Sequence, residues 1–175
     1  EMNPIIIIPA YNPPKSFKLL LKTIRKLTTI PIMIIDDGSS TKIMNKCEDS
    51  IILRNDKNCG KGFSLIKGFY EAKKRDYSHV ITMDSDSQHD PKMLNSFLEI
   101  NENFSIVLGN RQFNSNMPFH RKISNQLSSS IISCICHIKV LDSQCGYRRY
   151  KLMDVLSETY IEKGFQFESE VLIKL

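Results

Sequence analysis

The run of four isoleucines between two prolines at residues 4–9 constrains the fold more than any other feature of the sequence. A strand that is β-branched and apolar on both faces is typical of a parallel sheet covered by helices on both sides. Further apolar runs alternate with segments of helical spacing, and Pro91 suits the first turn of one of them. Such alternation predicts an α/β fold with a mostly parallel sheet, right-handed crossovers and flanking helices. We expect strands at 4–9, 31–35, 51–53, 78–83 and 106–108, and helices at about 15–28, 61–72 and 91–100.

The alternation ends after residue 111. A polar loop at 112–119 precedes an amphipathic helix at 120–138, which carries apolar residues on one face and Ser124, Asn125, Ser128, Ser129 and Ser133 on the other. The length of 175 residues predicts a single domain. The helical pattern at 168–175 stops abruptly, so we expect that a C-terminal continuation is missing.

Net charge, apolar content and cysteine count limit which partners the protein can bind and in which cellular compartment it works. The net charge of +5 suits anionic partners such as a sugar nucleotide or a membrane surface, and does not by itself indicate nucleic acid. No apolar run is long enough to span a bilayer, and no signal peptide is visible. Five cysteines, an odd number, favour reduced thiols. These features predict a cytoplasmic protein, and its positive charge is compatible with contact at the inner face of the cytoplasmic membrane.

Polar and acidic residues follow several of the predicted strands. They occur at 10–14, at Asp36–Ser40, at Asp84–Asp90 and at Gly109–Arg111. Ligands of open α/β sheets bind beyond the carboxyl ends of the strands, so we expect these loops to converge on one crevice. An isolated acidic turn would carry no ligand, whereas successive acidic strand ends indicate a pocket.

The sequence Asp84-Ser85-Asp86 is the strongest candidate for a metal site. Hard divalent cations prefer oxygen ligands and often share them with a phosphate. We predict that Mg²⁺ or Mn²⁺ is held mainly by Asp86, with Asp84 beside it and Gln88 as a further ligand. The alternative is a plain acidic turn at the end of a strand.

Five motifs together resemble the family 2 glycosyltransferases with the GT-A fold. They occur in the family's order along nearly the whole chain, and the residues that follow the two acids favour the branch that uses polyprenyl phosphates. The loop at 58–62 has neither Walker nor GxGxxG spacing. Pro13 departs from the pattern, since relatives often carry an acid there. The matching stretches are Pro9–Asn12, Asp36–Ser39, Asn58–Gly62, Asp84–His89 and Asp142–Arg148.

The resemblance implies an inverting transfer of a sugar from a UDP- or GDP-sugar to an acceptor, with Mg²⁺ or Mn²⁺ offsetting charge on the departing diphosphate. It also implies that residues 1–111 bind the nucleotide and residues 112–175 face the acceptor. Asp36 and Asp37 would hold the base and ribose, while Pro9, Tyr11 and Asn12 would line the nucleoside pocket. The implied substrate-binding residues are Pro9, Ala10, Tyr11, Asn12, Asp36, Asp37, Lys61, Asp84, Ser85 and Asp86.

Two kinds of acceptor remain open. A lipid phosphate is already anionic and needs mainly positioning, which the resemblance assigns to Arg111 and Arg121. A glycan hydroxyl would need a carboxylate to accept its proton, and Asp142 is the first candidate, followed by Glu168. The roles of Arg148 and Arg149 are undecided. His89 could approach the phosphates, although a lone loop histidine is more often solvated, and Glu168 and Glu170 could close the site or cap the last helix. Phe113, Met117 and Phe119 could contact lipid.

Three rival functions are compatible with parts of the sequence. A transferase acting on glycan hydroxyls in envelope polysaccharide differs only in its acceptor. A nucleotidyltransferase would show a Gly-rich first loop bearing Arg or Lys, which residues 10–13 do not resemble. A non-catalytic nucleotide-sugar-binding module is disfavoured by the intact pair of Asp84 and Asp86.

Overall fold

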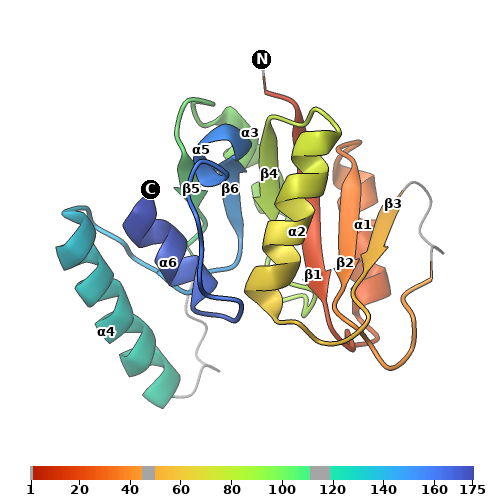
Figure 1. Cartoon of the computed structure of the whole chain (residues 1–175), viewed down its shortest axis with the longest axis horizontal. Helices are drawn as coiled ribbons and strands as arrows, with labels where there is room; N and C mark the ends of the chain where they lie inside the picture. Colours follow the sequence, from red (N-terminus) through yellow and green to blue (C-terminus); the bar gives the residue numbers. More distant parts are fainter. Residues whose placement is uncertain (1, 45–49, 111–118) are drawn as a thin grey trace.

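A six-stranded sheet organises the chain in this computed structural model, which describes residues 2–44, 50–110 and 119–175, with the backbone alone for 119–124. The strand order is β3-β2-β1-β4-β6-β5 (Figure 1). The strands are β1 Pro4–Ala10, β2 Ile32–Asp36, β3 Ser50–Arg54, β4 His79–Thr82, β5 Ile106–Leu108 and β6 Arg148–Lys151. The helices are α1 Phe17–Leu27, α2 Lys61–Lys74, α3 Leu94–Glu99, α4 Phe119–Cys136, α5 Leu152–Val155 and α6 Phe167–Lys174, with a short 3₁₀ helix, η1, at Pro91–Met93.

The predicted mostly parallel sheet is confirmed, with one strand that the sequence analysis missed. Strands β3, β2, β1 and β4 pair in parallel, as the alternating pattern requires. Strand β6 lies between β4 and β5 and pairs antiparallel with both. Its sequence, Arg-Arg-Tyr-Lys, has the composition of a solvated segment rather than of an interior strand.

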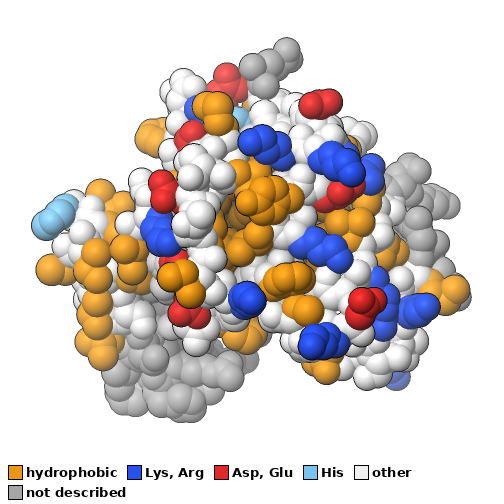
Figure 2. All heavy atoms as spheres, viewed as in Figure 1, with side chains coloured by type: hydrophobic (Ala, Val, Ile, Leu, Met, Phe, Trp, Pro, Cys, Tyr) orange, Lys and Arg blue, Asp and Glu red, His pale blue; other side chains and the backbone are white. Residues whose placement is uncertain are grey.

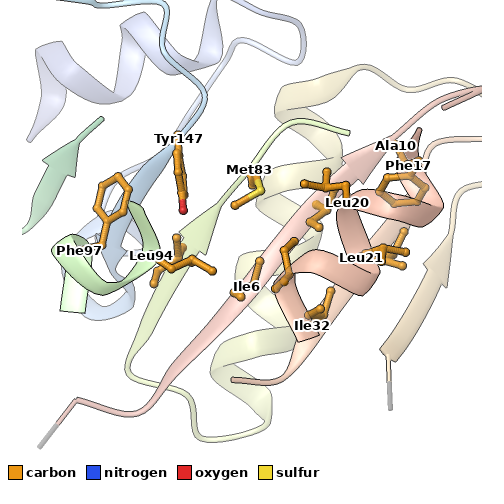
Figure 3. Close-up of a cluster of buried hydrophobic side chains, with 14 of the residues drawn as sticks. Ile6, Ala10, Phe17, Leu20, Leu21, Ile32, Met83, Leu94, Phe97 and Tyr147 are labelled. Carbon is orange, nitrogen blue, oxygen red and sulfur yellow. The ribbon is translucent and has the colours of Figure 1, made fainter. Parts of the chain in front are cut away.

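Helices cover both faces of the sheet, which explains the composition of β1. Its four isoleucines are fully buried, and they alternate between two cores. One core lies under α1 and α3, where Phe97 and Tyr147 lie together and Leu20 and Leu21 of α1 pack over the sheet (Figure 3). The other lies under α2, α5 and α6. Each buried isoleucine contributes about 1.5–3 kcal/mol to folding.

Two buried arginines hold β6 in place. Arg148 donates to the carbonyls of Ser143, Cys145 and Glu168, each at 2.7 Å. Arg149, on the opposite face of the strand, donates to three carbonyls of residues 97, 100 and 101, each at 2.6 Å. Both side chains are fully buried. Their role, undecided from the sequence, is therefore to satisfy backbone carbonyls inside the fold.

Candidate active site

The loops at the carboxyl ends of the parallel strands contact one another. Asp37 N–H donates to the Ala10 carbonyl at 2.8 Å, joining the ends of β2 and β1. The side chain of Asn12 accepts from Ser40 N–H at 2.9 Å, and its backbone N–H donates to the Ser39 hydroxyl at 2.9 Å. These hydrogen bonds join the loops after β1 and β2. The loop after β4 lies at the same edge of the sheet, where Asp84 pairs with Lys61.

Asp36 shapes the turn that follows β2. Its fully buried carboxylate accepts from Ser39 N–H at 2.9 Å and Ile43 N–H at 3.3 Å, and it pairs with the Arg54 guanidinium. Burial alone would raise the pKa of Asp36, but these donors outweigh burial and hold the pKa below its usual value. Asp36 thus acts within the fold as an ionised acceptor.

Asp37 fixes the Gly-rich loop at 58–62. One carboxylate oxygen accepts from the Asn55 amide at 2.7 Å and from Cys59 N–H at 2.9 Å, and the other accepts from Gly60 N–H at 2.9 Å. The side chain is buried. Asp37 therefore positions the loop that begins α2, and its predicted contact with the nucleoside stays a prediction.

Replacing Asp37 with alanine should lower both stability and donor affinity. The change removes the acceptor of Cys59 N–H and the nearer acceptor of Gly60 N–H, which keeps Asn58 Oδ1 at 3.2 Å, at a cost of about 1–3 kcal/mol of unfolding free energy. Thermal melting and calorimetric titration with UDP and GDP would measure both effects. Asp56→Ala, at an exposed position near the same loop, is the control. An Asp37→Ala variant that melts like wild type would contradict this role.

Lys61, the first residue of α2, lies between two carboxylates. Its ammonium is 2.6 Å from Asp84 Oδ1 and 2.9 Å from Glu168 Oε1. The second oxygen of Asp84 is 3.0 Å from His89 Nε2. These four side chains, from α2, the loop after β4 and α6, form what we call the Lys61 cluster.

Lys61 and Asp84 each stabilise the ionised form of the other. Burial would lower the pKa of Lys61, but the charges of Asp84 and Glu168 outweigh burial and hold the pKa above its usual value. Burial would likewise raise the pKa of Asp84, but the hydrogen bond with His89 and the charge of Lys61 hold the pKa well below its usual value. Lys61 is therefore an ammonium and Asp84 a carboxylate at neutral pH.

Two glycines let backbone segments approach the Lys61 cluster. A Cβ on Gly146 would lie 2.5 Å and 2.7 Å from the Asp84 carboxylate oxygens and 2.7 Å from the Lys61 ammonium. Gly60 has a φ of +99°, and a Cβ there would lie 2.4 Å from the Lys163 carbonyl. The motif at 142–148 thus contributes to the site through the backbone at Gly146, which closes over the ion pair.

Asp86 is an exposed carboxylate of the loop after β4, as is Asp90, which caps η1. Its Oδ1 accepts from Gln88 N–H at 3.0 Å, in a turn where Ser87 has a φ of +64°. Both oxygens of Asp84 already contact Lys61 and His89, which leaves Asp86 and the exposed Gln88 side chain facing outward. Among the described residues, no group of three His, Cys, Asp or Glu side chains could enclose a metal ion. Asp86 and Gln88 supply oxygen donors of the kind that Mg²⁺ and Mn²⁺ prefer, and an ion bound there would need further oxygen ligands from a bound molecule or water.

The remaining predicted site residues differ in how exposed they are, and some lie outside the described residues. Tyr11 is half exposed, Pro9 and Ser85 are partly buried and Ala10 is buried. Arg111 and the side chain of Arg121 lie outside the described residues, as do those of Phe113, Met117 and Phe119.

Asp142 lies apart from the contacts that define the Lys61 cluster. It is buried beneath α4, where its carboxylate accepts from the Asn125 amide at 3.0 Å and from Gln144 N–H at 3.2 Å. The predicted role of Asp142 as a catalytic base stays a prediction, and the burial of its carboxylate does not favour that role.

The sequence did not predict that His89 contacts Asp84 or that Glu168 pairs with Lys61. His89 was expected to be solvated but is buried, and it contacts Asp84. Glu168 was considered as a second candidate for a base, or as a residue that closes the site or caps the last helix, and it is the buried partner of Lys61. The helical spacing of Phe167, Val171 and Leu172, all now buried, was the available signal that this turn of α6 faces inward.

Comparisons with known proteins agree with this arrangement. A family model described as glycosyl transferase family 2 matches residues 5–159. The UDP-N-acetylglucosamine–dolichyl-phosphate N-acetylglucosaminyltransferase of Methanococcus voltae is 30% identical, over 96% of this chain and 78% of that protein. The undecaprenyl-phosphate mannosyltransferase of Micrococcus luteus is 25% identical, over 99% of this chain and 77% of that protein.

A solved structure supports the fold. The glucosyl-3-phosphoglycerate synthase of Mycobacterium tuberculosis, in complex with Mn²⁺, UDP and glucosyl-3-phosphoglycerate, matches with a TM-score of 0.77 at 16% identity. The match covers 98% of this chain and 64% of that one, so this chain spans less than two thirds of the length of that enzyme. The family match, the sheet and the convergence of the strand-end loops lead to one conclusion: the chain belongs to glycosyl transferase family 2 and has the GT-A fold.

Proposed function

We propose that the protein transfers a sugar from a UDP- or GDP-sugar to a polyprenyl phosphate, with inversion at the anomeric carbon. The observation that carries the donor half is the outward-facing Asp86 carboxylate beside the fixed pair of Asp84 and Lys61. Support for the acceptor half comes from two relatives whose names specify dolichyl phosphate and undecaprenyl phosphate. Mn²⁺ and UDP in the M. tuberculosis structure support a metal-assisted nucleotide donor.

The chain's own residues divide the work on the donor. A divalent cation, when bound, supplies positive charge that stabilises the departing nucleoside diphosphate. Asp86, with Gln88 beside it, would bind that cation. Asp84 stays ionised and is oriented by Lys61 and His89 on its two oxygens, so the loop that carries Asp86 is held in one place. The half-exposed ring of Tyr11 offers a surface for the base.

The acceptor chemistry fits a phosphate better than a hydroxyl. An acceptor phosphate oxygen is already anionic and can attack the anomeric carbon without losing a proton. A hydroxyl would need a free carboxylate, but Glu168 is paired with Lys61 and Asp142 is enclosed beneath α4. We therefore assign Arg111 and Arg121 to binding the acceptor phosphate, for which the planar guanidinium is well suited.

The proposed acceptor requires the protein to work at a membrane surface. A polyprenyl phosphate keeps its chain in the bilayer and presents its phosphate at the interface. In the described segments, no helix combines the length and the apolar character that a membrane span would need. We propose peripheral contact with the membrane.

A transfer assay would test the acceptor. Wild-type protein is expected to use a short-chain polyprenyl phosphate in preference to oligosaccharides. Arg111→Ala and Arg121→Ala should each lower kcat/KM for the lipid phosphate by roughly 10–100-fold, since charge-assisted hydrogen bonds contribute about 1.5–3 kcal/mol. Arg75→Ala, at an exposed position just after α2, is the matched control. Transfer to glycan alone would refute the proposed acceptor, whereas lipid transfer unaffected by either change would refute only the arginine clamp.

A further inference from the structure

The outer face of α4 carries a continuous line of apolar side chains. Leu127 is 62% exposed, Ile131 51%, Ile135 52% and Ile138, just after the helix, 59%. Leu127, Ile131 and Ile135 are spaced four residues apart, which places them on one side of the helix, and Ile138 follows the end of the helix. Figure 2 shows apolar side chains gathered along the left edge of the molecule, over α4. We call these four residues the α4 stripe.

The polar side of α4 faces the rest of the protein. Ser129 is buried, and its hydroxyl donates to the Ser143 hydroxyl at 3.1 Å and accepts from Ser143 N–H at 3.0 Å. Ser133 accepts from Val140 N–H at 2.9 Å, and the Asn125 amide donates to Asp142. Ile132 is the buried apolar residue on this side, where it packs with Val140 and Leu172.

This orientation reverses that of an ordinary surface helix, which turns its apolar side inward. The hydrogen bonds to residues 140–143 fix the rotation of α4, so the helix cannot turn to bury its stripe without breaking them. An exposed apolar face of this length indicates a surface that meets an apolar phase or partner.

The charge around the α4 stripe distinguishes between possible partners. The segment from Arg111 to Leu141 contains no Asp or Glu, but it contains four Lys and Arg, at 111, 121, 122 and 139. An apolar face on a segment that has basic residues and no acidic ones matches the interface of an anionic bilayer, where apolar side chains enter the acyl boundary and cations meet the headgroups. A contact between protein copies would not require the absence of acids.

The position of α4 relates the stripe to the site. Figure 1 shows the first residues of α4 at the same end of the molecule as the carboxyl ends of β1 and β2. A bilayer that contacts the outer face of α4 would therefore lie beside the edge where the donor is expected to bind.

We propose that the α4 stripe docks on the surface of a bilayer containing anionic lipid, with α4 lying in the plane of the interface. This placement rests on the proposed function for its purpose, since it brings the enzyme to a lipid-phosphate acceptor. The docking itself requires no catalysis and can be measured without it.

The test uses vesicles of phosphatidylcholine with and without phosphatidylglycerol. The protein should sediment with the anionic vesicles, and salt should weaken the binding. The double variant Ile131→Ser with Ile135→Ser should reduce partitioning by about tenfold or more, because binding scales with buried apolar area. Leu19→Ser, which removes an equally exposed apolar side chain from α1, should bind like wild type. Equal binding by the double variant would overturn the proposal.

Two further measurements separate the alternatives. Sedimentation velocity without lipid would reveal a second copy as the partner: a wild-type dimer that the double variant dissociates, with vesicle binding unchanged, overturns the proposal. Transfer to a water-soluble short-chain polyprenyl phosphate should survive in the double variant, while transfer to a long-chain acceptor in anionic vesicles falls. Vesicle binding without transfer to either acceptor would refute the proposed function and leave the docking surface in place.

Discussion

Asp86→Ala is expected to lower turnover on the order of 10³-fold while leaving the protein folded, because charge stabilisation at a departing diphosphate is a large part of such catalysis. The side chain is exposed and accepts from Gln88 N–H within its own loop. Its loss should therefore remove a ligand for the cation and leave both cores unchanged. Steady-state transfer rates with Mn²⁺ or Mg²⁺, together with thermal melting, would measure the two effects separately.

Glu99→Ala is the control for this experiment, since it removes an exposed acid on α3 and should leave the rate unchanged. Wild-type enzyme treated with excess EDTA should lose activity to a similar extent and recover it when Mn²⁺ is added. Full activity of Asp86→Ala, or of the EDTA-treated enzyme, would show that the transfer does not depend on a metal held by this loop.

Arg148→Met should produce the largest loss of stability among single changes in β6. The guanidinium satisfies three buried carbonyls, and hydrogen bonds to a charged group contribute about 1.5–3 kcal/mol each. Methionine fills much of the same volume but leaves the three acceptors without donors. We expect the free energy of unfolding to fall by at least about 3 kcal/mol, as measured by urea denaturation.

A matched control is Arg75→Met, just after the end of α2. Arg75 is partly exposed and pairs with Glu71 one turn away, so its loss should change stability by no more than about 0.5 kcal/mol. Similar midpoints for the two methionine variants would contradict a structural role for Arg148. Arg148→Lys should recover little stability, since one ammonium cannot reach three carbonyls held in a planar fork.

Hydrophobic periodicity was sufficient to predict the parallel part of the fold. The isoleucines of β1 are buried on both faces, and the predicted starts and ends of α1, β2 and β5 lie within two residues of those observed. The pattern failed at β6, because the burial of Arg148 and Arg149 depends on carbonyls contributed by distant segments. It also left the orientation of α4 open, since an amphipathic pattern does not reveal which face points inward.

The candidate site was predictable to a similar degree. Strand-end position was enough to select Asp84, whereas Lys61 was selected from its Gly-rich loop and the family resemblance. The structure joins the two in an ion pair. The partners of Asp36 and Asp37 were not predictable, because a turn sequence does not show whether its carboxylates accept from the protein or from a ligand. The inclusion of Glu168 depends on α6 packing against α2, a contact between residues more than a hundred positions apart in the sequence.

The place of β6 in the sheet has a consequence for how the protein is made. Strands β1 to β4 emerge first from the ribosome and can pair in parallel, but the free edge of β4 must wait for β6, since β5 is not its neighbour. An unpaired edge on an interior strand is a template for pairing with another chain. Nascent chains shorter than about 150 residues should therefore be the form most prone to aggregate and most dependent on chaperones. Lys61 also lacks its second carboxylate until Glu168 of α6 has been translated, so the Lys61 cluster is completed only after strands β1 to β6 have been made.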